Sequence, residues 1–245
     1  GVACHIIPGL SAFVGGDITA GILASGMLEQ EASTLLIDLG TNGEMALGNR
    51  HRLHACATAA GPAFEGGANR GIWGADMVRL LQKLLEEGLM DGQGLLKEPY
   101  FTKGVRIGDV LVTKESVRAV QLAKGAIAAG IEILADSYGI RFSDISKVVL
   151  AGGFGYYLDP KAAVAIGLLP EELADCTVTG GNTALSGAAM VGSRILTAGG
   201  KQTAEGTLPD GGDDLRKRQE LQIRILNLAE EEKFPETFLT KINFN

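Results

Sequence analysis

The sequence predicts an α/β fold built on a mixed β-sheet with helices on both faces, and three observations lead to this prediction. The chain has 245 residues, of which 46% are hydrophobic and 21% charged, so it can bury a large core. Short apolar runs alternate with helical patterns in the order helix, three strands, helices, strand, helix, strand, helix. Glycine accounts for 35 residues, and these gather at the ends of the apolar runs.

The first elements are expected to be a helix followed by a β-meander. Asp17 is a suitable N-cap for a helix within residues 9–28 that ends at Gly26. Residues 34–60 then show three strand patterns separated by short turn-forming runs. The first of these strands is apolar, which is typical of a strand buried on both faces.

The second half of the chain predicts alternating helices and strands. We expect helices at about 75–87, 115–138, 160–167 and 184–196, and strands at 147–151 and 176–179. The longest helix carries a continuous apolar stripe. A meander followed by β–α–β–α units implies a mixed sheet, here of five strands.

Three segments lie outside this regular order. Residues 75–113 are interpreted as a helical insertion, because only short strands or loops follow their helix. Residues 198–214 are rich in Gly and Asp and predict a linker after a domain that covers residues 1–197. Residues 215–245 are expected to form a C-terminal strand and tail that pack on this domain or on a partner.

Composition excludes several classes of protein. With 22 Lys and Arg against 29 Asp and Glu, the net charge is −7, which argues against binding nucleic acid through a general basic surface. No apolar run reaches the roughly 18 residues that span a membrane. The 3 cysteines are far apart and lack metal-binding spacing, which favours a reducing cytoplasm.

The run Asp38–Glu44 (DLGTNGE) lies where the first buried strand ends. A carboxylate at a strand tip suits Mg²⁺, which prefers oxygen ligands and keeps several waters. Thr41, Asn42 and the backbone N–H groups of the turn could face a phosphate. The alternative is a plain hairpin turn, since Asp, Gly and Asn all favour turns.

Two further Gly-rich runs close neighbouring strands, Gly152–Phe154 after residues 147–151 and Gly180–Asn182 after residues 176–179. Glycine at a strand tip lets a flat purine lie against the backbone, although a tight strand–helix connection also needs glycine. Ligands bind at adjacent strand tips in α/β sheets. The Gly-rich tips together therefore predict a ligand site.

Glu65, Gln121 and Lys124 are further candidates for that site. Glu65, in a Gly-rich loop, could act as a general base or orient a water, or it could be a solvated loop carboxylate. Lys124 falls within the apolar stripe of the long helix, where a charge needs a partner or a ligand unless its head reaches water.

In the order of these motifs, residues 9–197 resemble the second lobe of the actin, sugar-kinase and heat-shock-chaperone ATPases. The helix from Asp17 is similar to their connecting helix, Asp38–Glu44 to their second phosphate hairpin, and Gly152-Gly153 to their adenosine motif. The resemblance implies the ribonuclease H-like lobe of the actin-like ATPase fold.

The closest likeness is to the C-terminal domain of the reductive activators of corrinoid proteins. It is carried by the runs PGLS (8–11), GDI (16–18), DLGTNGE (38–44), GPAFEG (61–66), QLAKGAI (121–127) and AGGFG (151–155). Such activators hold a [2Fe–2S] cluster in an N-terminal domain and use ATP to drive an electron onto Co(II) of a corrinoid, which restores Co(I). The resemblance implies ATP and Mg²⁺ as cofactors and a corrinoid protein as partner.

The resemblance also implies roles for individual residues. Asp38 would hold Mg²⁺ through water and Glu65 would orient the attacking water, in chemistry that is mostly positioning and charge stabilisation. The residues expected to contact the nucleotide are Gly40, Thr41, Asn42, Gly43, Gln121, Lys124, Gly152, Gly153, Phe154 and Asn182.

The chain departs from the activators in two respects. Ferredoxin cysteine spacing is absent, so the cluster is expected only in a missing N-terminal part, and one Asp-x-Gly-Thr hairpin occurs where a two-lobed ATPase has two. We interpret the chain as the nucleotide-binding lobe of a longer ATPase coupled to electron transfer, inactive by itself. Two other interpretations stay open: a docking module that forms a homodimer through the strand at 221–228, and the lobe of a small-molecule kinase.

Overall fold

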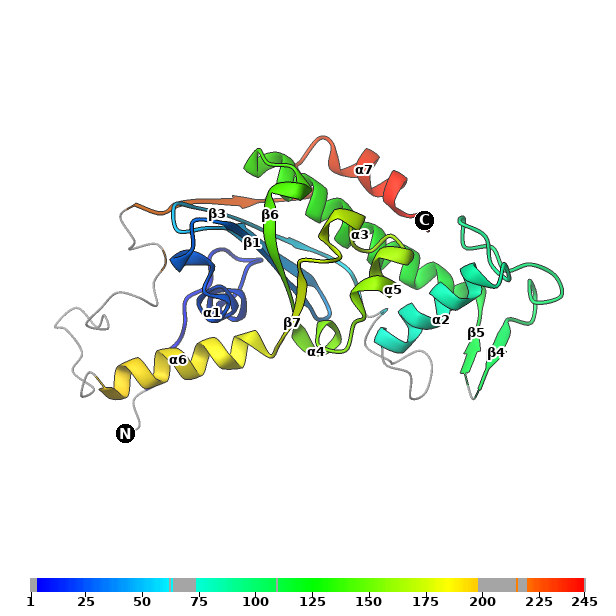
Figure 1. Ribbon diagram of the computed structural model, residues 1–245, viewed down its shortest axis with the longest axis horizontal. Helices are drawn as coiled ribbons and strands as arrows, with labels where there is room; N and C mark the ends of the chain where they lie inside the picture. The colour runs from blue at the N-terminus through cyan, green and yellow to red at the C-terminus, as the bar shows by residue number, and fades with distance from the viewer. Residues whose placement is uncertain are drawn as a thin grey trace.

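The computed structural model describes residues 4–61, 63, 74–108, 110–197, 215 and 220–244. Within these residues the chain forms a mixed six-stranded sheet, in the order β7-β6-β1-β2-β3-β8, and a separate β4–β5 hairpin. Helices lie on both faces of the larger sheet (Figure 1). The predicted α/β architecture is confirmed, but the expected number of five strands is wrong.

The element bounds follow the predicted order closely. The strands are β1 (Ser33–Leu39), β2 (Gly43–Gly48), β3 (Arg52–Thr58), β4 (Val105–Ile107), β5 (Val110–Val112), β6 (Ile145–Ala151), β7 (Thr177–Gly181) and β8 (Gln222–Leu226). The helices are α1 (Gly16–Ser25), α2 (Gly74–Glu86), α3 (Lys114–Tyr138), α4 (Gly152–Gly155), α5 (Pro160–Ala165), α6 (Thr183–Thr197) and α7 (Phe234–Lys241). One detail differs: Gly15 is the N-cap of α1, and Asp17 lies in its first turn.

Strand pairing brings distant parts of the chain together. β1, β2 and β3 form an antiparallel meander, whereas β6 pairs with β1, β7 with β6 and β8 with β3 in parallel. The sixth strand is β8, which adds to β3 of the same chain. The sequence pattern correctly indicates a strand at this position, but it carries no information about the neighbour, which lies about 170 positions earlier in the chain.

The two faces of the sheet bury separate hydrophobic clusters. The long helix α3 covers one face and packs on residues such as Ile37 and Met45, while α1 covers the other and packs on Leu36 and Ala46. This alternation follows from the two-residue period of a strand, because neighbouring residues point to opposite faces. Buried on both sides, β1 has the continuous apolar character that the sequence shows.

Two helices have close contacts at a glycine. On the outside of α1 lies α6, where a Cβ at Gly187 would overlap the backbone of Ala20. On the outside of α3 lies the C-terminal segment, where a Cβ at Gly125 would come within 3.2–3.4 Å of Ile242. The segment with α2 and the β4–β5 hairpin extends from the far end of α3 (Figure 1).

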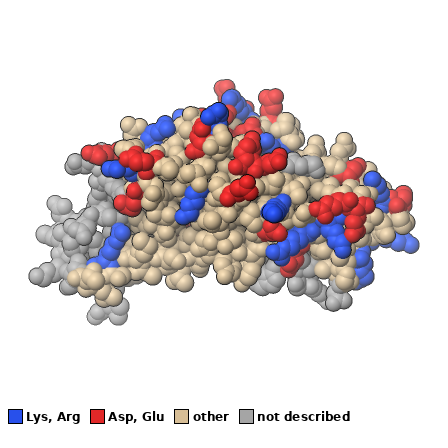
Figure 2. All heavy atoms as spheres, in the orientation of Figure 1, with Lys and Arg blue, Asp and Glu red and all other residues tan. Residues whose placement is uncertain are grey.

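Charged side chains are unevenly distributed over the surface. Figure 2 shows them gathered over α3, α7 and the segment with α2 and the β4–β5 hairpin, and sparse over the lower face in that view, where α4, β7 and α6 lie. Residues 176–193 contain no Asp, Glu, Lys or Arg, although much of this run is exposed. In the described part of the chain, no helix is both long and apolar enough to cross a membrane.

Candidate functional site

The C-terminal tips of β1, β6 and β7 meet at one edge of the sheet. Asp38 of β1 lies beside Ala151 of β6, and Ala151 lies beside Gly181 of β7. The short helix α4, which the sequence did not predict, begins directly after Ala151 and lies at this edge (Figure 1). The structure therefore brings together the three Gly-rich runs that the sequence places at separate strand ends.

Gly152 is the point of closest approach between these tips. Its φ of +84° lies in the left-handed region, which disfavours any residue with a Cβ. A Cβ at this position would also overlap Oδ1 of Asp38 and lie 2.6 Å from the carbonyl oxygen of Leu39. The glycine thus allows the backbone of α4 to touch the carboxylate at the tip of β1.

The carboxylates of Asp38, Glu44 and Asp17 converge near this point. Asp38 and Glu44 are opposite each other across the β1–β2 ladder, and Asp17 comes from the first turn of α1, which packs on the same sheet face. Burial, reinforced by the charge of Asp17, raises the pKa of Asp38 to about 6. Burial and the charges of Asp17 and Asp38 raise the pKa of Glu44 to about 7.

Raised pKa values mean that negative charge is poorly neutralised here. A bound cation would favour the ionised carboxylates and relieve their repulsion. Among the described residues, however, no group of three or more His, Cys, Asp or Glu side chains is arranged to hold a metal ion directly. The chemistry of this donor set fits a hydrated Mg²⁺ held through water and completed by oxygens of a ligand.

The β1–β2 turn leaves part of its backbone accessible. Gly40 faces open space apart from the carbonyl oxygen of Asn42, at 3.9 Å from an added Cβ, whereas Gly43 is packed against Thr58 and Ile127. Thr41 and Asn42 are exposed. The Asn42 side chain hydrogen-bonds Glu44, which partly offsets the rise in the pKa of that carboxyl.

An open pocket of about 800 Å³ lies beside the acidic residues. Asp17, Asn42, Glu44 and Thr58 are among its polar lining residues. The remaining walls come from the loop before α1, from the end of β3 and from the segment that follows β8: Ser11, Ala12, Phe13, Gly15, Ala57, Ala59, Ile225, Leu226, Asn227, Leu228, Ala229 and Phe234.

The other candidate residues at the strand tips differ in which of their groups are accessible to a ligand. Gly153 is exposed and an added Cβ there would meet nothing within 4 Å, so its backbone is open to a ligand. The Phe154 side chain is only 8% exposed and belongs to the main core, which leaves its backbone alone for contact. The Oδ1 atom of Asn182 accepts a hydrogen bond from the backbone of Leu185 and so caps α6.

Gln121 and Lys124 are occupied by contacts within the chain. Nε2 of Gln121 donates to the carbonyl of Gln93, and Nζ of Lys124 donates to the carbonyl of Asn243 and lies 5.3 Å from the ring centroid of Phe244. Burial, together with the charge of Lys241, lowers the pKa of Lys124 to about 8. The interpretation in which the lysine head reaches water is therefore wrong.

Two predictions lie outside the described residues, the role of Glu65 and the linker at 198–214.

The sequence analysis left two residues, Asp17 and Glu44, out of the predicted site. A signal was available for Glu44, because two residues joined by a tight hairpin turn are neighbours on one sheet face. Asp17 had no such signal, since its position depends on how α1 packs against the sheet.

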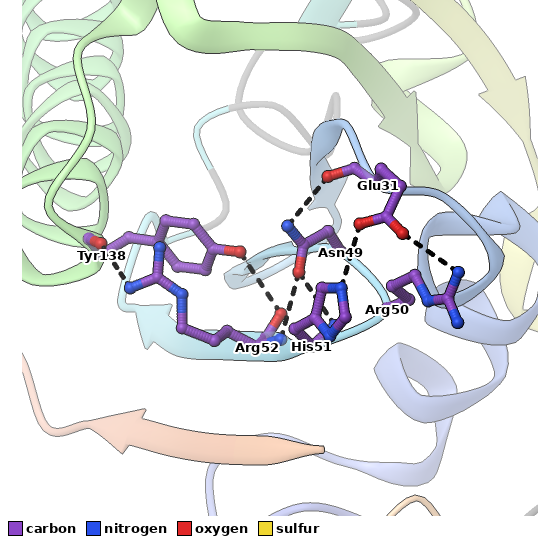
Figure 3. A network of polar contacts seen from close by, with 6 residues as sticks. All are labelled: Glu31, Asn49, Arg50, His51, Arg52 and Tyr138. Atoms are coloured by element: carbon purple, nitrogen blue, oxygen red, sulfur yellow. Dashed lines mark hydrogen bonds and ion pairs between the residues drawn. The ribbon is translucent and has the colours of Figure 1, made fainter. Parts of the chain in front are cut away.

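The opposite end of the meander holds a second group of polar residues (Figure 3). Glu31 contacts Nη1 of Arg50 at 3.0 Å and Nε2 of His51 at 2.9 Å, and its carbonyl accepts from Asn49. Arg52 lies 4.2 Å from the ring centroid of Tyr138 and donates to the Tyr138 carbonyl. These contacts tie the β2–β3 turn to the loop before β1 and to the end of α3.

Comparison with known proteins gives a consistent result. A family described as the C-terminal domain of RACo, the ASKHA domain, matches residues 32–70 and 68–198. A solved structure of a reductive activator for corrinoid, iron–sulfur protein superposes with a TM-score of 0.79 at 28% identity, covering 98% of this chain and 44% of that one.

Two curated proteins are also similar. The corrinoid activation enzyme RamQ of Eubacterium limosum is 35% identical in an alignment 222 positions long that covers 67% of this chain and 37% of RamQ. The [Co(II) methylated amine-specific corrinoid protein] reductase of Methanosarcina barkeri is 27% identical in an alignment 235 positions long that covers 75% of this chain and 43% of the reductase. The chain thus spans about two fifths of the length of these relatives.

Proposed function

This chain belongs to the family of the C-terminal ASKHA domain of RACo, and we propose that it is the nucleotide-binding lobe of an ATP-dependent activator that restores Co(I) in corrinoid proteins. The observation that carries the proposal is the convergence of the β1, β6 and β7 tips, where Gly152 packs against the carboxylate of Asp38 and the next residue, Gly153, is open to a ligand. The relatives that it matches are named as activators or reductases of corrinoid proteins.

In this proposal Asp38 holds Mg²⁺ through water, and Glu44 and Asp17 share the neutralisation of its charge. A bound Mg²⁺ would supply positive charge that offsets the negative charge of the ATP phosphates. Thr41 and Asn42 are exposed in the β1–β2 turn, where they can reach the phosphates, and Gly153 offers open backbone to the nucleoside. Glu65 remains our candidate for orienting the attacking water.

The residues of this chain do not fit an iron–sulfur cluster. A [2Fe–2S] centre takes four ligands, commonly four thiolates, whereas the chain has 3 cysteines, and of these Cys4 is exposed while Cys56 is buried in the core. We therefore place the cluster in another part of the parent protein. The single electron that converts Co(II) to Co(I) would come from that cluster, and ATP binding and hydrolysis on this lobe would drive the transfer.

The proposal extends to the setting of the parent protein. We place it in the cytoplasm, where its thiols stay reduced, and we propose a homodimer. One side of β8 pairs with β3, so only the opposite side of this edge strand is available for pairing across a two-fold axis.

Calorimetric titration with Mg-ATP and Mg-ADP tests the nucleotide site. We expect weak binding, because the other lobe would supply about half of the phosphate contacts and exclude water from them. Asp38→Ala should weaken binding at least tenfold. Asp144→Ala is the matched control, since Asp144 lies just before β6, at the opposite end of that strand, and pairs with Arg141. Equal affinity of the Asp38 variant and the wild type would refute the assignment.

The activator role is tested on a protein that includes the cluster domain. Reduced protein, ATP and a corrinoid protein in the Co(II) state should give the Co(I) absorbance, and Asp38→Ala should abolish its dependence on ATP. A phosphorylated small-molecule product would instead favour a kinase.

The docking alternative is favoured by the uncharged run at 176–193. It predicts that the chain binds a protein partner but no nucleotide.

A further inference from the structure

Residues 242–244, which follow α7 and which we call the strap, lie between α3 and the loop after α2. That loop, at 88–97, is called the α2 loop below. Ile242 and Phe244 of the strap are only 9% and 6% exposed, although no side chain of α7 itself is buried. Phe244 belongs to the main core cluster together with apolar residues of α3. The strap, and not the helix before it, therefore reaches into the core.

Lys124 of α3 anchors the strap. Its Nζ donates to the carbonyl of Asn243 and lies 5.3 Å from the ring centroid of Phe244, so both contacts are made with the strap. The lysine head is a buried charge whose hydrogen-bond acceptor is a neutral carbonyl, and burial of such a charge is costly. When the strap moves away, the ammonium regains water, which offsets part of the free energy that opening costs. A purely apolar anchor would have no such compensation.

The strap also holds the α2 loop. The Phe244 N–H donates to the carbonyl of Gly92 at 2.7 Å. Beside this bond, Nε2 of Gln121 donates to the carbonyl of Gln93 at 2.9 Å, and a Cβ at Gly94 would overlap the amide of Gln121. The α2 loop is thus seated on α3 by one side chain of α3 and by the main chain of the strap.

The α2 loop is connected to the strand-tip site through α2. The N–H groups of Leu89 and Met90 donate to the carbonyl of Leu84 in α2, which joins the loop firmly to the helix. The Lys97 N–H donates to the carbonyl of Leu89 and closes the loop on itself. On its other side α2 packs on α4 and α5, and α4 begins at the glycine that touches the carboxylate of Asp38. A displacement of the loop is therefore transmitted by α2 to α4.

We propose that the strap positions the nucleotide site: held closed by Lys124, it fixes the α2 loop and, through it, α2 against α4, and bound nucleotide favours this closed arrangement. The inference rests on the proposed nucleotide site. Lys124 and Gln121 are then positioning residues, which act through the strap and the α2 loop while their side chains are occupied within the chain.

Hydrogen exchange, followed by mass spectrometry on the 245-residue chain, tests the strap. Phe244→Ala should make the amides of the α2 loop exchange at least about tenfold faster, because it weakens the buried contact that must break when the loop opens. Lys124→Met keeps the apolar stem but loses the donor, and should accelerate the same amides by at least about threefold. Leu239→Ala is the matched control, since Leu239 lies just before the strap but is 66% exposed, and it should leave these rates unchanged.

Saturating Mg-ADP tests the coupling to the site, and it should slow exchange of the α2 loop in the wild type by at least about threefold. Equal rates with and without bound Mg-ADP would refute the coupling. Unchanged loop exchange in Phe244→Ala would show that the loop opens without the strap, and Lys124→Met decides the same point if Phe244→Ala does not fold. If the wild type binds no Mg-ADP, the proposed nucleotide site and the coupling both fail, whereas the rates in the variants still show whether the strap holds the loop.

Discussion

The two ends of the β1–β2–β3 meander differ in whether their charged side chains are neutralised by a partner. At the tip of β1, the carboxylates of Asp38, Glu44 and Asp17 converge. Burial and the charge of Asp17 raise the pKa values of both Asp38 and Glu44. At the other end, the carboxylate of Glu31 is paired with Arg50 and His51, and Arg52 lies over the ring of Tyr138 (Figure 3).

The difference separates a binding end from a structural end. Oppositely charged side chains that pair within the folded protein neutralise each other, so they need no ligand. Converging carboxylates at half-buried positions oppose folding, and a protein that keeps them obtains the compensating charge from a bound cation. On this reasoning, substitutions at the two ends should affect stability and binding in opposite ways.

The largest effect on stability is expected from Gly152→Ala. The left-handed φ costs about 1–2 kcal/mol for alanine, and the overlap with Asp38 and Leu39 adds about 1–3 kcal/mol. Gly139→Ala is the matched control at the structural end, because its φ of +79° is similar but an added Cβ meets nothing within 4 Å. Denaturant unfolding should show a clearly larger loss for Gly152→Ala. Equal losses would mean that the contact with Asp38 is not tight.

The next effect is expected at the structural end, from Arg52→Met. The substitution removes the cation–π contact and the hydrogen bond to the Tyr138 carbonyl while keeping the apolar stem. We expect a loss of about 1–2 kcal/mol in the free energy of unfolding and no change in Mg-ADP affinity. A marked loss of affinity would show that the two ends are coupled.

Asp38→Asn should stabilise the protein above neutral pH while weakening Mg-nucleotide binding. Because the pKa of Asp38 is raised to about 6 in the folded state, the wild type loses stability as pH rises from about 4 to 6. The neutral asparagine avoids this loss. Two pKa units correspond to about 3 kcal/mol, and solvent screening reduces the expected gain to about 1 kcal/mol at pH 8. The gain should disappear at pH 4, which unfolding curves at both pH values can check.

Binding of Mg-ADP near pH 7 should release protons, because the cation lowers the pKa of Glu44 from about 7. A group half-protonated before binding can release up to about half a proton. Titration in two buffers with different ionisation enthalpies measures the number released. Glu44→Gln should reduce it, whereas an unchanged number would exclude Glu44 from the cation site.

Much of this fold could be predicted because it depends on local patterns. Apolar runs and terminal glycines place nearly every strand and helix, and the order of Gly-rich runs predicts a ligand edge. Long-range pairing could not be predicted: β8 joins β3 across most of the chain, and Lys124 meets Asn243, 119 residues later. The long helix identifies Lys124 as a charge that needs a partner, but only tertiary packing shows that the partner is a C-terminal carbonyl.

The smallest effect is expected from Glu31→Gln at the structural end. Glu31 contacts Arg50 and His51, but its side chain is 70% exposed, so solvent screens both pairs. The expected loss is about 0.5 kcal/mol or less, and it should shrink further in 1 M salt, where the Debye length is about 3 Å. Unfolding at low and high salt measures both values. A loss above about 1 kcal/mol that salt does not reduce would mean that the β2–β3 turn depends on Glu31 for its conformation. The contrast between a neutralised end and an uncompensated end would then rest on backbone geometry as well as on charge.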